Sequence, residues 1–389
     1  MDETSKKPVS AFEKRVKRRI ASRQHTFYIS TAPGLIGRLE REVAETLGVI
    51  PERLTGGVSF AGRLERMWEA ALSLRFANRI LVRLAEFSAS DFRRLEKRCR
   101  EVPWELWLPE GAAVEVAASA HHCRLYHTGA IEERVGRVVD TALGGRGQMA
   151  AQRITVRGEN DRFTLSLDAT GDALYKRDLK VHGGRAPIRE TLAAAILDMV
   201  GYTGAEPLVD PMCGTGTFSI EAAMVASHTA PGLFRSFAFE AWPSFRLPAF
   251  QHLREGLLAK KMAAPAKIVA SDGDGEAIRR LKETLPHLPF GEAITPLQAD
   301  FFELTPEALG LKEPGVVVFN PPYGKRIAGG GSELVLRLVE RLSSCWAGWR
   351  IAIAVPKNQI PSSLRKKSSL SVYPLAHGGL DLSVLCGTL

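Results

Sequence analysis

Residues 208–218 read LVDPMCGTGTF and hold the pattern that decides the fold. A short apolar run ends in the acid Asp210, a turn carries Gly214 and Gly216, and an apolar helical pattern begins near Thr217. A strand, a glycine turn and a helix in this order are typical of Rossmann-like sheets, where the turn brings its backbone close to a ligand. The alternative is a tight turn that binds nothing.

The turn does not match the two common phosphate-binding patterns. No Gly-Lys-Ser/Thr follows it, and Ser219 stands where a dinucleotide motif has its third glycine. A ligand with a cationic amino-acid end and a nucleoside end fits better than a pyrophosphate, and S-adenosylmethionine is such a ligand. The cofactor-binding residues predicted in this stretch are Asp210, Pro211, Cys213, Gly214, Gly216 and Thr217.

Outward from this stretch, strand and helix patterns alternate from residue 189 onward. The predicted helices cover 189–200, 217–227, 275–285 and 332–344, and the predicted strands cover 207–210, 267–272, 294–300, 315–320 and 350–355. Such alternation implies a parallel sheet covered by helices on both faces. The fold class predicted for this half is α/β, a Rossmann-like doubly wound domain.

Acids stand at the ends of successive predicted strands. Asp272 ends the second strand and is expected to accept hydrogen bonds from both ribose hydroxyls; Glu240 is nearer in sequence but follows no strand. After the third strand, Asp300 is an acceptor for an adenine amine and Phe301 a ring to lie on its face. Arg189, at a helix start, is expected to meet the cofactor carboxylate, a phosphate or a salt-bridge partner. Each acid alone is equally compatible with a cap or a turn.

Residues 316–324, VVVFNPPYG, form an apolar run that stops at an amide, two prolines and an aromatic residue. The prolines fix the backbone at the strand end, so the Asn320 side chain and the Pro321 carbonyl are held rigidly. These two acceptors could take both hydrogens of a planar amine and localise its lone pair, while Tyr323 stacks on a base. We predict Asn320, Pro321, Pro322 and Tyr323 as the catalytic residues.

The first half of the chain has an α+β pattern and much of the positive charge. Strand-like runs at 25–31, 112–119 and 162–169 lie among helical stretches at 35–48 and 129–144. The net charge is +9, and residues 1–24 hold eight Lys or Arg against three acids. This leader is expected to be either a solvated, partly disordered arm or an arm that follows phosphates. Residues 172–188 are basic, rich in glycine and without periodicity, as in a linker.

Composition restricts the class of protein. The 389 residues are 45% hydrophobic and 24% charged, which fits a globular chain of two or three domains. No apolar run is long enough for a bilayer and the N-terminus lacks a signal-peptide core, so a cytoplasmic protein without a membrane partner is expected. Five scattered cysteines predict reduced thiols, and the run HHCRLYH at 121–127 lacks paired ligand spacing, so no metal is expected.

Three motifs together carry a family resemblance: GGRAPIRETLAAAIL at 183–197, DPMCGTGTFSIEAA at 210–223 and NPPYGKRI at 320–327. With GGVSFAG at 56–62 and PWELWLP at 103–109, they resemble the THUMP-domain RNA methyltransferases, most closely the bacterial guanine-N2 methyltransferases of large-subunit (23S) ribosomal RNA. The resemblance implies a basic arm at 1–24, a ferredoxin-like segment at 25–75, a THUMP RNA-binding domain at 76–171, a linker at 172–188 and a methyltransferase domain at 189–389.

The resemblance also implies an activity: S-adenosylmethionine-dependent methylation of a guanine N2 amine in RNA, with 23S rRNA favoured over tRNA. The best-known member of the family carries a second methyltransferase domain, whereas this chain ends at Leu389, so a single modification is expected. The alternatives are a tRNA guanine-N2 enzyme, a DNA adenine-N6 methyltransferase, a protein-glutamine methyltransferase and an inactive RNA-binding factor. The sequence leaves the oligomeric state open, with a monomer favoured.

Overall fold

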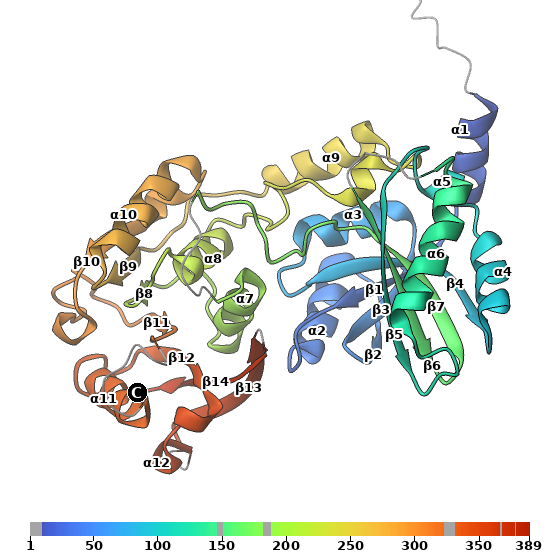
Figure 1. Ribbon diagram of the computed structural model, residues 1–389. Helices are drawn as coiled ribbons and strands as arrows, with labels where there is room; N and C mark the ends of the chain where they lie inside the picture. The colour runs from blue at the N-terminus through green and yellow to red at the C-terminus, as the bar shows by residue number, and fades with distance from the viewer. Residues whose placement is uncertain (1–9, 146–150, 182–187, 323–330, 366–367, 378) are drawn as a thin grey trace, which may run out of the picture.

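The computed structural model describes residues 10–145, 151–181, 188–322, 331–365, 368–377 and 379–389. It contains two seven-stranded sheets, one in each half of the chain, and each sheet is packed with helices (Figure 1). None of the described helices combines the length and the apolar character needed to cross a bilayer.

The N-terminal sheet has the strand order β2-β3-β1-β4-β7-β6-β5, and only the β5–β6 pair is parallel. Strands β1 and β4 pair directly, so the predicted ferredoxin-like and THUMP segments share one continuous sheet. Apolar side chains such as Phe27, Val82 and Leu165 line one face and are buried with the helices. The elements are β1 (His25–Ser30), α2 (Ile36–Leu47), β2 (Glu52–Leu54), β3 (Gly57–Gly62), α3 (Leu64–Ser73), β4 (Arg79–Ser88), α4 (Phe92–Arg100), α5 (Trp104–Trp107), β5 (Val114–His121), α6 (Thr128–Ala142), β6 (Gln152–Glu159) and β7 (Arg162–Asp168).

The C-terminal sheet has the order β10-β9-β8-β11-β12-β14-β13, and its first five strands are parallel. Strand β11 is buried on both faces: Val316 and Val318 pack on the side of α7, α8 and α10, and Val317 and Phe319 on the side of α11. This is the predicted doubly wound α/β fold. Its elements are α7 (Glu190–Met199), β8 (Leu208–Asp210), α8 (Thr217–Ala226), α9 (Leu247–Leu258), β9 (Ile268–Asp272), α10 (Gly275–Thr284), β10 (Ile294–Gln298), β11 (Val316–Phe319), α11 (Gly331–Cys345), β12 (Arg350–Pro356), α12 (Ser362–Arg365), β13 (Leu370–His377) and β14 (Leu380–Thr388).

The predicted strands and helices of the second half are all present, with ends that differ by a few residues at most. The sequence analysis missed the last two strands, which form an antiparallel hairpin beside β12, and it missed helix α9. Strand β13 lies at the edge of the sheet and contains Pro374. A proline inside a strand-like run of residues argues against a strand, unless that strand lies at the edge of the sheet. The sequence alone does not show which strands lie at an edge.

The start of the chain differs from the predicted solvated arm. Residues 11–16 form helix α1, which continues as a turn of π-helix over residues 17–21. Ser10 and Glu13 form a capping box at its start. Val16 and Ile20 are buried in the main core, so this segment packs against the N-terminal domain.

The two halves pack together through residues 228–258, an insertion that lies between α8 and β9. Phe239 and Phe250 from this segment lie against the buried ring of Trp68 on α3. Gly232 approaches α3 so closely that an added Cβ would lie 2.5 Å from the Ala71 carbonyl oxygen. Helix α9 contacts α3 (Figure 1), so the insertion is the part of the C-terminal half that docks on the N-terminal half.

Candidate active site

The chain order reverses between β8 and β11, which are neighbours in the sheet. The chain runs from β8 outward to β9 and β10, then returns to the other side of β8 as β11. Open α/β sheets bind ligands at the carboxyl ends of the strands at such a switch point. Here the residues after β8 form the glycine turn, and the residue after β11 is Asn320.

The glycine turn has the geometry that the sequence predicted. Gly214 has φ +54° and Gly216 has φ +82°, and both angles lie in the left-handed region that favours glycine. An added Cβ at Gly214 would meet no atom within 4 Å, so this face of the turn is open. At Gly216 an added Cβ would lie 2.6 Å from Leu281 Cδ1. The absence of a side chain at Gly216 therefore allows the turn to pack closely against α10.

Asp272 at the end of β9 holds the turn in place. Its Oδ2 accepts a hydrogen bond of 2.8 Å from the Gly214 backbone N–H, and its Oδ1 accepts one of 2.9 Å from Asp274. The carboxylate is therefore oriented by two main-chain donors beside the open face of Gly214. Glu240 instead accepts a hydrogen bond from the Phe237 backbone and caps a short 3-10 helix.

Asp210 at the end of β8 is fully buried. Its Oδ2 accepts a 2.8 Å hydrogen bond from Ser219 Oγ, whereas its Oδ1 has no partner among the described residues. Burial raises the pKa of Asp210 to about 7; the negative charge of Asp272 adds to this, and the charge of Lys180 opposes it. An orphaned buried acceptor at this position fits a cationic or hydrogen-bonding ligand group.

Lys180 is a largely buried cation near this acid, with a side chain that is 13% exposed, and the sequence analysis did not identify it. Its ammonium donates a 2.5 Å hydrogen bond to Thr217 Oγ1 and lies 3.5 Å from Glu190 Oε1. Burial lowers the pKa of Lys180, and the charge of Glu190 opposes that shift. Lys180 lies in the segment predicted as a linker, where no periodicity indicates which residues point inward.

The raised pKa of Asp210 predicts a pH-dependent stability. Between about pH 4 and pH 7 the folded state keeps a proton on Asp210 that the unfolded chain loses. The free energy of unfolding therefore falls as the pH rises through this range. Asp210→Asn, which can still accept from Ser219, should therefore raise the melting temperature at pH 8 more than at pH 5. Thermal unfolding without ligand at both pH values measures this. Asp381→Asn, at an exposed position, is the control, and an equal shift at both pH values would contradict the assignment.

The amide of Asn320 lies at the tip of β11. Its Oδ1 atom is buried and has no hydrogen-bond partner among the described residues. Pro321 is buried and Pro322 is exposed, while Tyr323 lies outside the described residues. The structure therefore places an unsatisfied amide oxygen on a rigid strand end, on the strand next to that of the glycine turn.

The remaining predicted site residues have separate surroundings. Asp300 is exposed and accepts a 2.9 Å hydrogen bond from the Phe302 backbone N–H. The ring of Phe301 is 2% exposed and packs on Phe319, which differs from the expected stacking on a ligand; the neighbouring ring of Phe302 is half-buried.

Arg189 lies at the start of α7, immediately before Glu190. Its guanidinium lies over the ring of Tyr175, 4.7 Å from the ring centroid, and its charge helps to lower the pKa of His377, which burial lowers more. The structure thus places Arg189 over the ring of Tyr175. No contact to the glycine turn is described for it.

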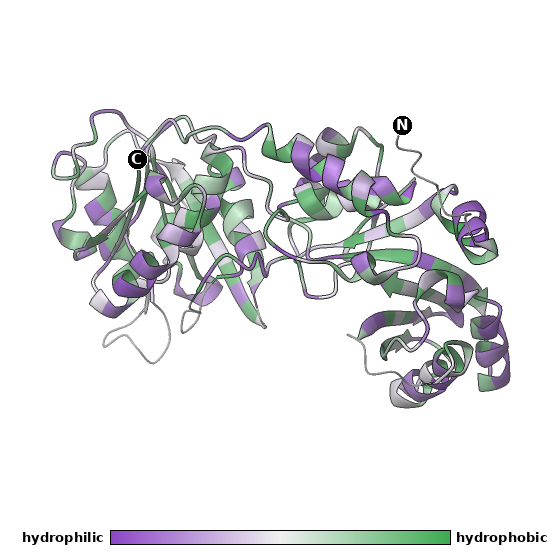
Figure 2. Ribbon diagram, turned by 90° about the horizontal axis from the view of Figure 1, so that it is seen from above, coloured by the Kyte–Doolittle hydropathy of each residue, from purple (hydrophilic) through white to green (hydrophobic). Residues whose placement is uncertain are grey.

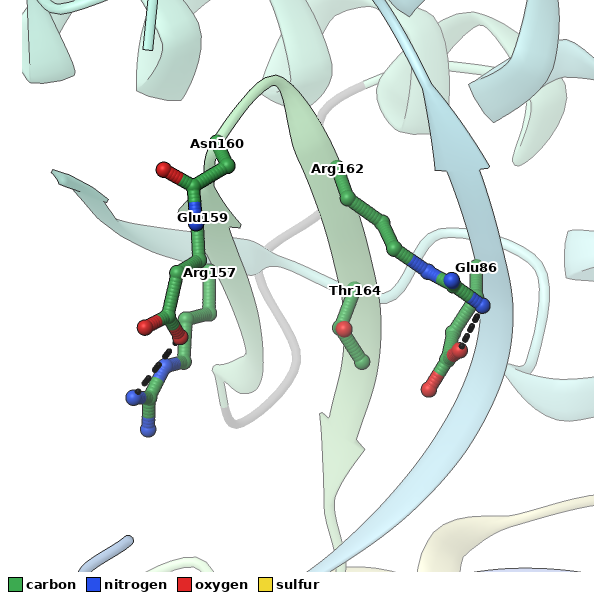
Figure 3. A pocket seen from close by; sticks show the side chains of 6 residues that line it. All are labelled: Glu86, Arg157, Glu159, Asn160, Arg162 and Thr164. Carbon is green, nitrogen blue, oxygen red and sulfur yellow. Dashed lines mark hydrogen bonds and ion pairs between the residues drawn. The ribbon is translucent and has the colours of Figure 1, made fainter. Parts of the chain in front are cut away.

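A separate hollow lies on the N-terminal sheet, over β4, β6 and β7 (Figure 3). Its arginines are paired: Arg157 lies 3.3 Å from Glu159, and Arg162 lies 3.2 Å from Glu86. Within the described residues, no three His, Cys, Asp or Glu side chains gather in a way that could hold a metal ion.

Comparison with known proteins agrees with this geometry. Residues 177–384 match the family model described as RMKL-like methyltransferase domain (UPF0020), and residues 26–81 match the RlmL ferredoxin-like domain. The "Ribosomal RNA large subunit methyltransferase K/L" of Psychromonas ingrahamii is 31% identical over 89% of this chain and 48% of its own length. The chain thus spans about half the length of this relative.

Other relatives match over most of their own length. The Bacillus subtilis protein named "Putative RNA methyltransferase YpsC" is 32% identical over 77% of this chain and 79% of its own. A crystal structure described as "SMU.472, a putative methyltransferase complexed with SAH" has a TM-score of 0.84, with 25% identity over 94% of this chain and 98% of that chain. The chain therefore belongs to the RMKL-like methyltransferase family and carries an RlmL ferredoxin-like domain ahead of the methyltransferase domain.

Proposed function

We propose that the protein is an S-adenosylmethionine-dependent RNA methyltransferase that methylates the exocyclic N2 amine of a guanine in 23S rRNA. The observation that carries the proposal is the buried Asn320 Oδ1, which has no partner among the described residues and lies at the switch point beside the glycine turn. Membership of the methyltransferase family and the relative named for large-subunit rRNA support it.

The cofactor is assigned to the open side of the glycine turn. Asp272, already oriented by two backbone donors, would take the ribose hydroxyls, and Asp300 the adenine amine. The amino-acid end would lie toward the turn residues Pro211, Cys213 and Thr217, where the buried Oδ1 of Asp210 has no partner in the described part of the chain. S-adenosylmethionine, when bound, supplies an electrophilic methyl group.

The protein's part of the reaction is to prepare the amine. A guanine N2 lone pair is delocalised into the ring, so it is a poor nucleophile. The Asn320 oxygen and the Pro321 carbonyl would accept the two amine hydrogens and aim the lone pair at the methyl carbon. The methyl group would come from the bound cofactor, and the methylated amine would then lose a proton to water. A base that acts before transfer is unnecessary.

The N-terminal half would hold the RNA for this chemistry, and residues 76–171 would act as its THUMP domain. We assign no metal and no membrane partner to the reaction. Ribosomal RNA as substrate implies a cytoplasmic enzyme, and we take a monomer as the working unit.

Deleting the gene tests the proposal directly. Purified large-subunit rRNA and tRNA from mutant and parent strains are digested to nucleosides, and N2-methylguanosine and N6-methyladenosine are quantified by mass spectrometry. Loss of one N2-methylguanosine from the rRNA is the expected result. Loss from tRNA would keep the chemistry and change the substrate, and unchanged rRNA and tRNA pools would contradict an RNA methyltransferase.

A DNA adenine methyltransferase is the second candidate, since an Asn-Pro-Pro strand end accepts the hydrogens of any planar amine. A solved protein with TM-score 0.82 and 27% identity is described as a predicted N6-adenine-specific DNA methylase from Listeria monocytogenes. Methyl transfer from labelled cofactor to duplex DNA in vitro, with none to large-subunit rRNA, would favour this candidate.

A further inference from the structure

Helix α1 and the π-helical turn after it are firmly attached to the protein. Val16 and Ile20 are buried, and Arg15 forms a 2.7 Å ion pair with Glu105. His25, which follows the segment, lies 2.9 Å (Nε2 to oxygen) from the Ile20 carbonyl and packs edge-on against Trp107. Side chains on this helix therefore have fixed starting positions.

The outer face of the helix is strongly cationic. Val16 and Ile20 face the protein core, whereas all the cations of residues 14–19, which flank these two positions or lie opposite them, remain exposed. All the cations of the segment are exposed, and in Figure 2 the helix that follows the N-terminus is largely purple. Those with no ion pair or side-chain hydrogen bond to any described residue are Lys14, Lys17, Arg18, Arg19 and Arg23.

The clustering of these cations distinguishes the segment, since five of them lie within residues 14–23. Elsewhere many exposed arginines are paired, including those of the hollow in Figure 3, and cations without a described partner, such as Lys260, Lys282 and Lys312, lie far apart in the sequence. An exposed ion pair contributes little to stability, and its two charges largely cancel, so it attracts a phosphate only weakly. Several cations on one helix without described partners instead create a local positive potential. The segment also lies outside both family models, which begin at residues 26 and 177.

We infer that the helix over residues 11–21 is a second RNA contact, which binds phosphates of the substrate far from the reacting base. The inference rests on the proposed RNA substrate. The helix lies at the outer end of the N-terminal domain, on the side away from the methyltransferase sheet (Figure 1). An RNA that reaches both sites must be long enough to extend across the molecule, and large-subunit rRNA meets this requirement.

An anionic membrane surface is a poorer fit for these cations. Interfacial helices insert an apolar face opposite their basic face. Here the apolar residues Val16, Ile20 and Ala21 face the protein core, and Phe12, at 41% exposure, is the single large apolar side chain on the described outer surface of the helix. Phosphates can be bound by the cations alone.

The test compares wild-type protein with Lys17→Gln/Arg18→Gln/Arg19→Gln. The matched control is Lys260→Gln/Lys282→Gln/Lys312→Gln, which removes three exposed cations of the catalytic half with no described partner. Binding to a transcript of large-subunit rRNA is measured by filter binding between 50 and 200 mM KCl with saturating S-adenosylhomocysteine. Melting temperatures check that each variant is folded. They should change little, because Gln is nearly as good a helix former as Lys or Arg.

The helix variant should bind on the order of tenfold more weakly near 0.15 M salt, and the slope of log K against log salt should become shallower by about 2, since each phosphate contact contributes roughly 0.7 to 0.9. The control should stay within about twofold of wild type. Unchanged affinity and slope in the helix variant, or an equal loss in the control, would overturn the inference. Helix-dependent binding to vesicles with 30% phosphatidylserine but not to RNA would also overturn it. Failure of the wild type to bind rRNA would instead count against the proposed function.

Discussion

Asn320→Ala should reduce methyl transfer by on the order of 10²- to 10³-fold while S-adenosylhomocysteine binding stays within about twofold of wild type. The Asn320 oxygen is preorganised on a rigid strand tip, and losing one such polar contact has an effect of this size in other enzymes. Cofactor affinity should survive, because the glycine turn and Asp272 hold each other independently of this amide. Calorimetry and transfer of labelled methyl to rRNA measure the two quantities.

Asn358→Ala is a suitable control for this variant. Asn358 is an exposed amide just after β12, the strand next to β11, so its loss tests whether any amide at this edge matters. The control should keep near-normal turnover. Normal turnover in Asn320→Ala would contradict the amine-binding role, and a parallel loss of cofactor binding would reduce the role to a structural one.

Arg177→Met should lower the free energy of unfolding by about 3–5 kcal/mol, the usual cost of leaving one partner of a buried ion pair alone. Arg177 is 3% exposed, and its Nε donates a 3.1 Å hydrogen bond to Glu221, which is fully buried on α8. The same guanidinium also donates to the carbonyls of Leu174 and Arg75. Arg75 forms a longer ion pair with Glu221, at 3.9 Å, which is too long for a hydrogen bond and so does not replace the bond from Arg177. Urea unfolding measures the change.

Arg157→Met is the matched control, because Arg157 forms an exposed pair with Glu159 that should be worth at most about 1 kcal/mol. The double variant Arg177→Met/Glu221→Met should be more stable than Arg177→Met alone, since it removes the buried carboxylate that has lost its hydrogen-bonded partner. An Arg177→Met variant as stable as the Arg157 control would show that the ion pair does not hold the halves together.

The parts of the site that could be read from the sequence are those fixed by local rules. Continuous apolar runs followed by Asp210, Asp272 and Asn320 predicted strand tips, and parallel strands bring such tips to one edge. Left-handed glycines at 214 and 216 follow from the same turn.

The parts that were missed depend on tertiary contacts. Whether Phe301 or Phe302 points inward is decided by packing on Phe319, which no local pattern contains. Lys180 and Arg177 are charged residues in an aperiodic segment. Arg177 is buried and Lys180 is largely buried, and they pair with Glu221 and Glu190 of the catalytic half, which no local pattern indicates. The helix at the N-terminus was predicted as an arm because its composition is dominated by cations. The few apolar residues that anchor it, such as Val16 and Ile20, do not form an obvious pattern in the sequence.

The docked insertion and the Arg177 ion pair fix the distance between the two ends of the molecule. Trp68, Phe239 and Phe250 pack as one aromatic cluster across the junction, so the domains should not swing freely. An RNA that contacts both helix α1 and Asn320 would then have to span a fixed distance between the two sites. Selection of one guanine among many would need no base-specific contacts at the far end, only the correct spacing between a phosphate-rich surface and the extruded base.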